Sequence, residues 1–193
     1  IQKSHSLEND LVGGLISYLS DNNLLSPEET LTIYLNTLKS MNTEQMGDYL
    51  GIESLLNTSD SDKNSIASAL VEQVHQNFDF KITSCEEQGY TATISTEITT
   101  FDSSSILNTF SEEQNAYLSS ADAVIDGSEK RYQKTLEMLL NDIENNAATI
   151  TSTADFHLTN DGVSWKLDDS NTTIGNAIFG TLSSSPVNEE TAE

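Results

Sequence analysis

Positive charge is scarce in this chain. Eight Lys and Arg residues face 31 Asp and Glu residues, which gives a formal net charge of −23. Binding to nucleic acid needs clustered cations to neutralise phosphates, so DNA and RNA are excluded as partners. The same argument excludes attraction to an anionic membrane surface through charge alone. We interpret the acidic balance as a source of solubility through self-repulsion, with attraction of cations or basic partners as the alternative.

Cysteine and long apolar runs are lacking too. Cys85 is the single cysteine, so no disulfide can form within the chain. The carboxylates of Glu86 and Glu87 are expected to raise the pKa of its thiol, which argues against a reactive thiolate. No run of 18 apolar residues occurs, and we therefore expect no transmembrane helix. Because the sequence begins at Ile1, we expect a further segment to precede it.

Motifs of catalysis are missing as well. His5, His75 and His157 have no metal-binding spacing with one another or with Cys85. No GxSxG elbow and no glycine-rich phosphate loop is present. The acidic pairs of the sequence, such as Glu28-Glu29, are interpreted as helix-dipole or solubility residues. We therefore predict no catalytic residue, no metal and no cofactor, and we expect the protein not to be an enzyme.

One stretch resembles the start of a calcium loop. Asp60-Ser-Asp62-Lys-Asn64 has the acidic spacing of such a loop. Ser65 stands where the loop needs glycine, however, and Val71 stands where it needs a bidentate glutamate. We predict instead that Asp60 or Asp62 caps the helix that follows.

Helical periodicity first appears clearly at Ser26-Pro27-Glu28-Glu29. Serine can cap a helix, proline suits the first helical position, and Glu29 completes a capping box. Apolar residues follow at helical spacing, namely Leu31, Tyr34, Leu35 and Leu38. Further helices are expected from a cap at Thr43 to Gly51, from Asp62 to Gln76, from Asp102 to Gly127 with a second capping box at Ser111, from Ser128 to Ala147, and from a cap at Asn171 or Thr172 to Gly180.

In the central helical block the apolar residues are expected to face inward. Val124 and Ile125 continue a face that begins at Tyr117 and Ala121. Tyr132 begins the inward stripe of the longest helix, which continues through Leu136, Leu139, Leu140, Ile143 and Ala147. Gly127-Ser128 is expected to break the block into two helices.

Four segments have the period of two that is typical of strands. Phe78, Phe80 and Ile82 alternate with polar residues, and a turn at residues 86–89 leads into a second alternating run that starts at Tyr90 and ends at Phe101. Residues 151–169 form a predicted hairpin around Asn160-Asp161-Gly162, with Ala154, Phe156, Leu158, Val163, Trp165 and Leu167 on its apolar phase. Strand pairs separated by helical blocks predict an α+β fold with one antiparallel sheet of about four strands.

This organisation predicts one domain with two flanking segments. Residues 26–180 are expected to form a single α+β domain, with a loop at residues 53–61. Residues 1–25 are expected to be a linker or weak helix, because Gly13-Gly14 interrupts the apolar spacing. Residues 181–193 have the Ser, Pro, Glu and Thr composition of a disordered acidic tail.

Several aromatic residues are predicted to approach one concave face of the sheet. The candidate ligand-binding residues are Tyr34, Leu38, Phe78, Tyr90, Phe156 and Trp165. They are interpreted first as ordinary core. The functional alternative is a pocket between the sheet and the helices.

Two ends of this region resemble known proteins. The stretch SPEETLTIYLNTLKSMNTEQMGDYL is similar to the opening of nuclear-transport-factor-2-like (cystatin-like) domains. The stretch FHLTNDGVSWKLDDSNTTIGNAIFG resembles the close of a group of Gram-positive extracellular lipoproteins of unknown function, which share an Asp-Gly turn, a W-K-(I/L)-D strand and a short last helix. The resemblance implies a cone-shaped α+β domain, export, and attachment to the membrane through a lipidated cysteine upstream of Ile1.

We expect from this a cell-surface, non-enzymatic binding or interaction module. Its partner would be a small apolar ligand, a peptide or another envelope component, and the membrane would be reached only through the lipid anchor. Two alternatives are a small enzyme of the same fold with a carboxylate or histidine in its pocket, and a structural spacer on the cell envelope. Enzymatic relatives of the fold place Asp and His inside the cone, whereas the inward strand phases here are apolar or Thr and Ala.

Overall fold

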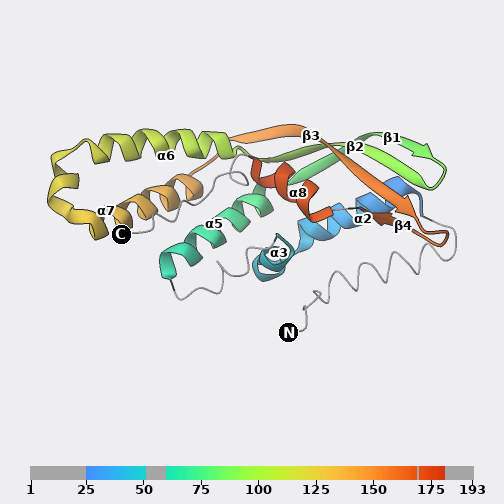
Figure 1. The fold of residues 1–193 in the computed structure, drawn as a ribbon, viewed down its shortest axis with the longest axis horizontal. Coiled ribbons are helices and arrows are strands. Elements are labelled where there is room, and N and C mark those ends of the chain that lie inside the picture. The colour runs from blue at the N-terminus through green and yellow to red at the C-terminus, as the bar shows by residue number, and fades with distance from the viewer. Residues whose placement is uncertain (1–24, 51–59, 169, 181–193) are drawn as a thin grey trace, which may run out of the picture.

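The computed structural model describes residues 25–50, 60–168 and 170–180. Within these residues lie six helices and four strands (Figure 1). Some expectations lie outside the described residues. They concern residues 1–24, Gly51, the predicted loop up to Ser59, and the acidic tail from Thr181. The predicted domain limits therefore stay predictions.

The four strands form one antiparallel sheet in the order in which they occur along the chain. They are β1 (Asp79–Gln88), β2 (Thr91–Phe101), β3 (Thr149–Asn160) and β4 (Trp165–Leu167). Ile94 of β2 pairs with Phe156 of β3, so large apolar side chains meet on the inner face. A bulge between Ile82 and Ser84 shifts the pairing of β1 with β2. The predicted α+β class with a four-stranded antiparallel sheet is confirmed.

Three helices, α2 (Pro27–Ser40), α5 (Ser61–Asn77) and α8 (Ser170–Phe179), pack on the inner face of this sheet, and α3 (Thr43–Leu50) packs against α5 and α8. Together with the sheet we call these four helices the body. The leucine stripe of α2 is closed off from solvent, as are Ile94, Ile98 and Phe156 of the strands. Alternate residues of β2 are buried, so the period of two in the sequence is the period of burial.

The predicted helix caps are confirmed in part. Ser26 and Glu29 form the full capping box, with N–H···O distances of 2.8 and 3.1 Å. Asp60 caps α5 by accepting from the backbone of Asp62 and Lys63. The predicted cap at Thr43 is wrong: Asn42 exchanges hydrogen bonds of 2.9 Å with Gln45 in both directions, because its amide side chain also fits that role. Helix α8 begins at Ser170, before either predicted cap residue.

Two long helices between β2 and β3 form a hairpin that extends away from the sheet (Figure 1). They are α6 (Ser103–Leu118) and α7 (Ala121–Glu144). Asp102 caps α6 through the backbone N–H groups of Ser104 and Ser105. The predicted capping box at Ser111 is wrong, because Asp102 already starts a helix that continues through this position.

Two predicted inward residues of the strands lie in turns instead. Tyr90 follows Gly89, whose φ of 66° makes the turn between β1 and β2, and its side chain is 71% exposed. Val163 lies in the loop between Asn160 and Trp165, which pair with each other, and it too is exposed. In both cases the apolar alternation continues past the end of the strand, so periodicity alone assigns the residue to the wrong environment.

Candidate interaction surface

The six predicted pocket residues lie in three different environments. Leu38, Phe78, Phe156 and Trp165 belong to one hydrophobic cluster of the body and are buried. Tyr34 is half-buried, and burial raises the pKa of its hydroxyl while nearby Lys166 lowers it. Tyr90 is exposed, so its predicted place on the concave face is wrong. None of the six is among the residues that line four grooves in the described part of the chain. Their contact with a ligand stays a prediction.

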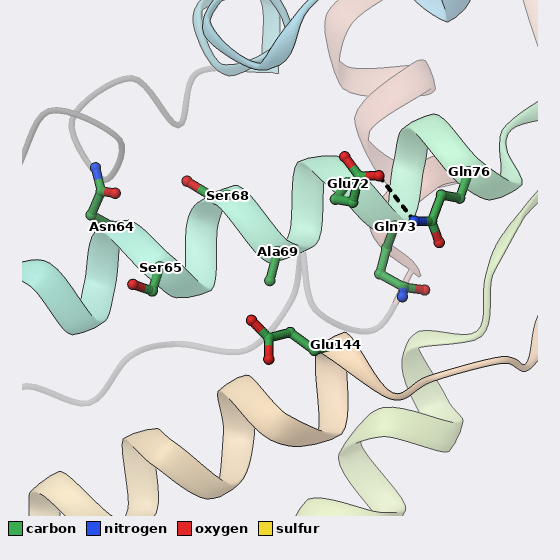
Figure 2. Close-up of a pocket in the computed structure, with 8 residues that line it drawn as sticks. All are labelled: Asn64, Ser65, Ser68, Ala69, Glu72, Gln73, Gln76 and Glu144. Carbon is green, nitrogen blue, oxygen red and sulfur yellow. Dashed lines mark hydrogen bonds between the residues drawn. The ribbon is translucent and has the colours of Figure 1, made fainter.

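The groove drawn in Figure 2 lies between α5 and the end of α7 and has a volume of about 400 Å³. Its walls are mainly polar, with Asn64, Ser65, Ser68, Ala69, Glu72, Gln73, Gln76 and Glu144 lining it. Gln76 donates a hydrogen bond of 2.9 Å to Glu72 on the same helix. The Ser65 hydroxyl donates to the Ser61 carbonyl at 2.8 Å and not to a carboxylate of the lining.

Neither a metal centre nor a reactive thiol is found in the part of the chain that the structure describes. No group of three His, Cys, Asp or Glu residues there could hold a metal ion. Burial, with Glu28 and Glu87 adding negative charge, raises the pKa of Cys85. The predicted direction is confirmed, although burial is the largest cause. A thiol with a raised pKa is a poor nucleophile at neutral pH.

Large apolar side chains gather at the far end of the α6–α7 hairpin. We call residues 117–134 the hairpin tip. Leu118 is 48% exposed, Val124 79% and Ile125 80%. Tyr132, on the next turns of α7, is also exposed. The prediction that Val124, Ile125 and Tyr132 face inward is wrong, because this end of the hairpin projects beyond the body (Figure 1).

A buried carboxylate holds the hairpin tip together. The side chain of Asp126 is 6% exposed and contacts both lysines that follow it on α7, with Lys130 Nζ 2.7 Å from Oδ1 and Lys134 Nζ bonded to Oδ2. The Tyr117 hydroxyl of α6 donates to the same Oδ2 at 2.8 Å. These hydrogen bonds, from Lys130, Lys134 and Tyr117 in that order, hold the pKa of Asp126 well below its usual range. The carboxylate therefore stays ionised and links the two helices.

The pKa values of Tyr117 and Lys134, two partners of Asp126, are also shifted. Burial and then the carboxylate raise the pKa of the Tyr117 hydroxyl, while Asp126 raises the pKa of Lys134. The ammonium of Lys134 also lies 5.2 Å from the centre of the Tyr117 ring, within range of a cation–π interaction. Both groups stay protonated at neutral pH, so the network keeps its hydrogen bonds there.

The backbone of the tip is fixed at two points. Ser120 ends the link between the helices and caps α7 by accepting from the Ala123 N–H. Gly127 interrupts α7 with φ of 74° and ψ of 174°, a conformation that residues with a Cβ rarely adopt. Arg131 spans the interruption by donating to the Ala123 carbonyl at 2.9 Å. The predicted break at Gly127 is confirmed, because the backbone is non-helical at this residue and two helices meet there across a kink.

Charge at the hairpin tip is balanced. Residues 117–134 contain three acids, Asp122, Asp126 and Glu129, and three bases, Lys130, Arg131 and Lys134. These are three of the eight cations of the whole chain, so the net charge of −23 resides elsewhere. The hairpin tip is therefore a charge-balanced region with exposed apolar side chains at the end of a strongly acidic molecule. Sequence reasoning missed this region, although Asp126 and Lys130 have the i,i+4 spacing that is typical of an ion pair.

Comparison with known proteins gives little further information. No protein-family model matches the chain, and no curated protein matches it. Among solved structures, a candidate lipoprotein of Bacillus subtilis, YcdA, is similar with 15% sequence identity and a TM-score of 0.46. The likeness covers 88% of this chain and 56% of that one, so this chain spans little more than half its length. Likeness at this level carries no conclusion. Among the described helices, none is both long and apolar enough to cross a bilayer.

Proposed function

We propose that the protein is a non-enzymatic interaction module of the cell envelope, carried as a lipoprotein, and that it binds a protein partner through the hairpin tip. One observation carries this proposal: Leu118, Val124 and Ile125 are exposed together at the end of a projecting, internally braced hairpin. The envelope location rests on the resemblance of the region around Trp165 to extracellular lipoproteins.

Leu118, Val124 and Ile125 are three large apolar side chains exposed where α6 and α7 join. Single exposed apolar residues are common, whereas a cluster of them marks a contact surface. The structure around these side chains supports a contact surface as well. Asp126 joins both helices, and Gly127 has a backbone conformation that residues with a Cβ rarely adopt. A braced backbone presents the apolar side chains with little loss of freedom on binding.

The partner is a protein with an apolar groove. A second copy would bring another net charge of −23 toward the first, and an anionic bilayer would repel the acidic body in the same way. Because the charge of the tip is balanced, this repulsion is absent at the tip but remains at the body. A partner that binds the tip alone therefore avoids the repulsion. Helical anchors that enter an apolar groove are a recurring mode of recognition.

Site-specific photo-crosslinking in the native host tests this function. A photoreactive phenylalanine replaces Ile125 in the full chain, and the matched control carries it at Thr153, an exposed residue of β3. We expect a discrete adduct from position 125 that is absent from position 153. Adding Val124→Ser and Leu118→Ser to the first variant should abolish the adduct.

Three results would contradict the proposal. Equal adducts at both positions would mean that contact is unspecific. The absence of any adduct at position 125 would remove the tip as the contact surface. An adduct of twice the protein's own mass would show that the occupant is a second copy.

A further inference from the structure

A crevice where α6 begins and α7 ends contains a carboxylate that the proposed function does not use. We propose that this crevice binds a small primary ammonium group and that Asp142 is the residue that holds its charge. The site lies at the base of the hairpin, far along both helices from the tip, and does not depend on the proposed partner.

Asp142 is buried without being paired. The residue is 8% exposed, and its Oδ2 atom is closed off from solvent with no hydrogen-bond partner. None of the salt bridges among the described residues includes it. A buried carboxylate normally has a cation or several donors around it, because an unpaired buried charge is strongly destabilising. The missing partner is the first indication of a ligand.

The crevice offers further oxygens beside this carboxylate. It has a volume of about 220 Å³ and is lined by Ser105, Ile106, Thr109, Asp142, Asn145, Asn146, Ala147 and Ala148. Hydroxyl groups come from α6, and the side-chain amides come from the end of α7. An ammonium group has three N–H donors and no acceptor, so it is satisfied by one carboxylate together with hydroxyl or carbonyl oxygens.

One wall of the crevice is held in place from the body. Asn146 donates to Gln73 of α5 at 3.1 Å, and Gln73 donates back to the Asn146 carbonyl at 3.3 Å. The Asn146 side chain also bonds both the N–H and the carbonyl of Ala148. These bonds are made before any ligand arrives, so the site is preorganised.

The negative charge at and near Asp142 favours binding of a cation. The residues that line the crevice favour an organic cation over a metal ion. Burial is the larger cause that raises the pKa of Asp142, and the negative charge of Glu113 is the second. Both effects are relieved when a positive charge enters the crevice. A divalent metal would need more anionic ligands than Asp142, which is the single acidic residue of the lining, and no group of three such residues exists among the described ones. A volume of about 220 Å³ accommodates a small alkylammonium group.

Titration with ethylammonium, followed by NMR at pH 7 and constant ionic strength, tests the site. We expect saturable shifts of the Ser105, Thr109 and Asn145 amide signals. Asp142→Asn should abolish saturation while preserving the fold, since the amide has the same shape and carries no charge. Glu113→Gln should weaken binding about two- to five-fold, as expected for a nearby but solvent-screened charge.

Glu112→Gln is the matched control, because it removes the same charge from the neighbouring position of α6. Binding that is unchanged in Asp142→Asn would overturn the proposal, and so would the absence of saturation up to 100 mM, an upper limit on the order of the weakest useful affinity. Equal weakening by Glu112→Gln and Glu113→Gln would also overturn it, because it would mean diffuse attraction to an acidic protein. Tetramethylammonium should not compete, since it has charge without N–H donors.

The ammonium group could come from a free amine or from a lysine side chain, and two further probes separate these sources. A peptide with one lysine is compared with the same peptide acetylated at that lysine, and with 1,3-diaminopropane. Tighter binding of the lysine peptide that acetylation abolishes would assign the site to a protein lysine. Tighter binding of the diamine would assign it to a free amine.

Discussion

The body and the hairpin tip use the same residue types in opposite ways. In the body, Leu31 and Leu35 of α2 are closed off from solvent beneath the sheet. In the tip, Leu118, Val124 and Ile125 face outward, and polar contacts around Asp126 hold the helices together instead. Apolar burial therefore stabilises the body, whereas the tip keeps its apolar surface available. The comparison predicts that substitutions act on stability in the body and on binding in the tip.

The largest effect is expected from Trp165→Ala in the body. Trp165 is a buried member of the hydrophobic cluster, and loss of such an aromatic should lower the free energy of unfolding by about 3–5 kcal/mol. Tyr132→Ala, an equally drastic truncation on the exposed part of α7, should change it by less than about 0.5 kcal/mol. Denaturant unfolding measures both. A change below about 1 kcal/mol for Trp165→Ala would place this residue outside the core.

The second effect separates the stability of the tip from that of the body. Gly127→Ala forces a Cβ into a backbone conformation that costs about 1–3 kcal/mol. We expect faster hydrogen exchange in the first turns of α7 and unchanged exchange in β2. Gly175→Ala in α8 is the control, because Gly175 has open space around it and no positive φ. Equal acceleration in β2 would show that the tip and the body unfold together.

The third effect is a gain in stability at the base of the hairpin, and it depends on pH. Because the folded-state pKa of Asp142 is raised, the ionised carboxylate destabilises the fold at pH values above that pKa. This penalty disappears as the pH falls below the unfolded pKa. Asp142→Asn should therefore raise the free energy of unfolding at pH 7 by about 1 kcal/mol, and the gain should shrink as the pH falls. Urea unfolding from pH 7 to pH 4 measures it, and a gain independent of pH would contradict the cause.

The smallest effect on stability is expected at the apolar end of the tip. Val124→Ser with Ile125→Ser removes exposed methyl groups only, so the free energy of unfolding should change by about 0.5 kcal/mol or less. Binding of the partner should be lost, as followed by crosslinking from position 118. A large drop in unfolding free energy would mean that these side chains are packed in the free protein.

Sequence patterns predict the helices and strands of the body well, because the apolar periodicity of each element corresponds to the face that is buried. The capping box at Ser26, the cap at Asp60 and the alternation through Ile94 and Phe156 all have local causes that the structure confirms. The two caps depend on residues a few positions apart. The alternation depends on a period of two, and the apolar residues of that period face the core.

The hairpin tip could not be predicted in the same way. Helical spacing shows that Val124 and Ile125 share a face with other apolar residues, but it does not show whether anything covers that face. The covering surface ends before the tip because α6 and α7 are longer than the body beside them. The Asp142 crevice is equally invisible in sequence, since Ser105 and Asn145 lie far apart along the chain and meet only when the hairpin closes.

The pairing of Phe101 with Thr149 has a consequence for how this protein can vary. The hairpin leaves the sheet and returns to it at paired residues, and the Asp102 N–H donates to the Ala148 carbonyl at 2.9 Å beside them. Among the described residues, the hairpin contributes Ile106 and Ile143 to the core, and Leu139 packs against it. Whole helical turns can thus be added to or removed from both helices beyond these residues without altering the strand register. The length of the α6–α7 hairpin, inserted between the neighbouring strands β2 and β3, can therefore vary independently of the sheet.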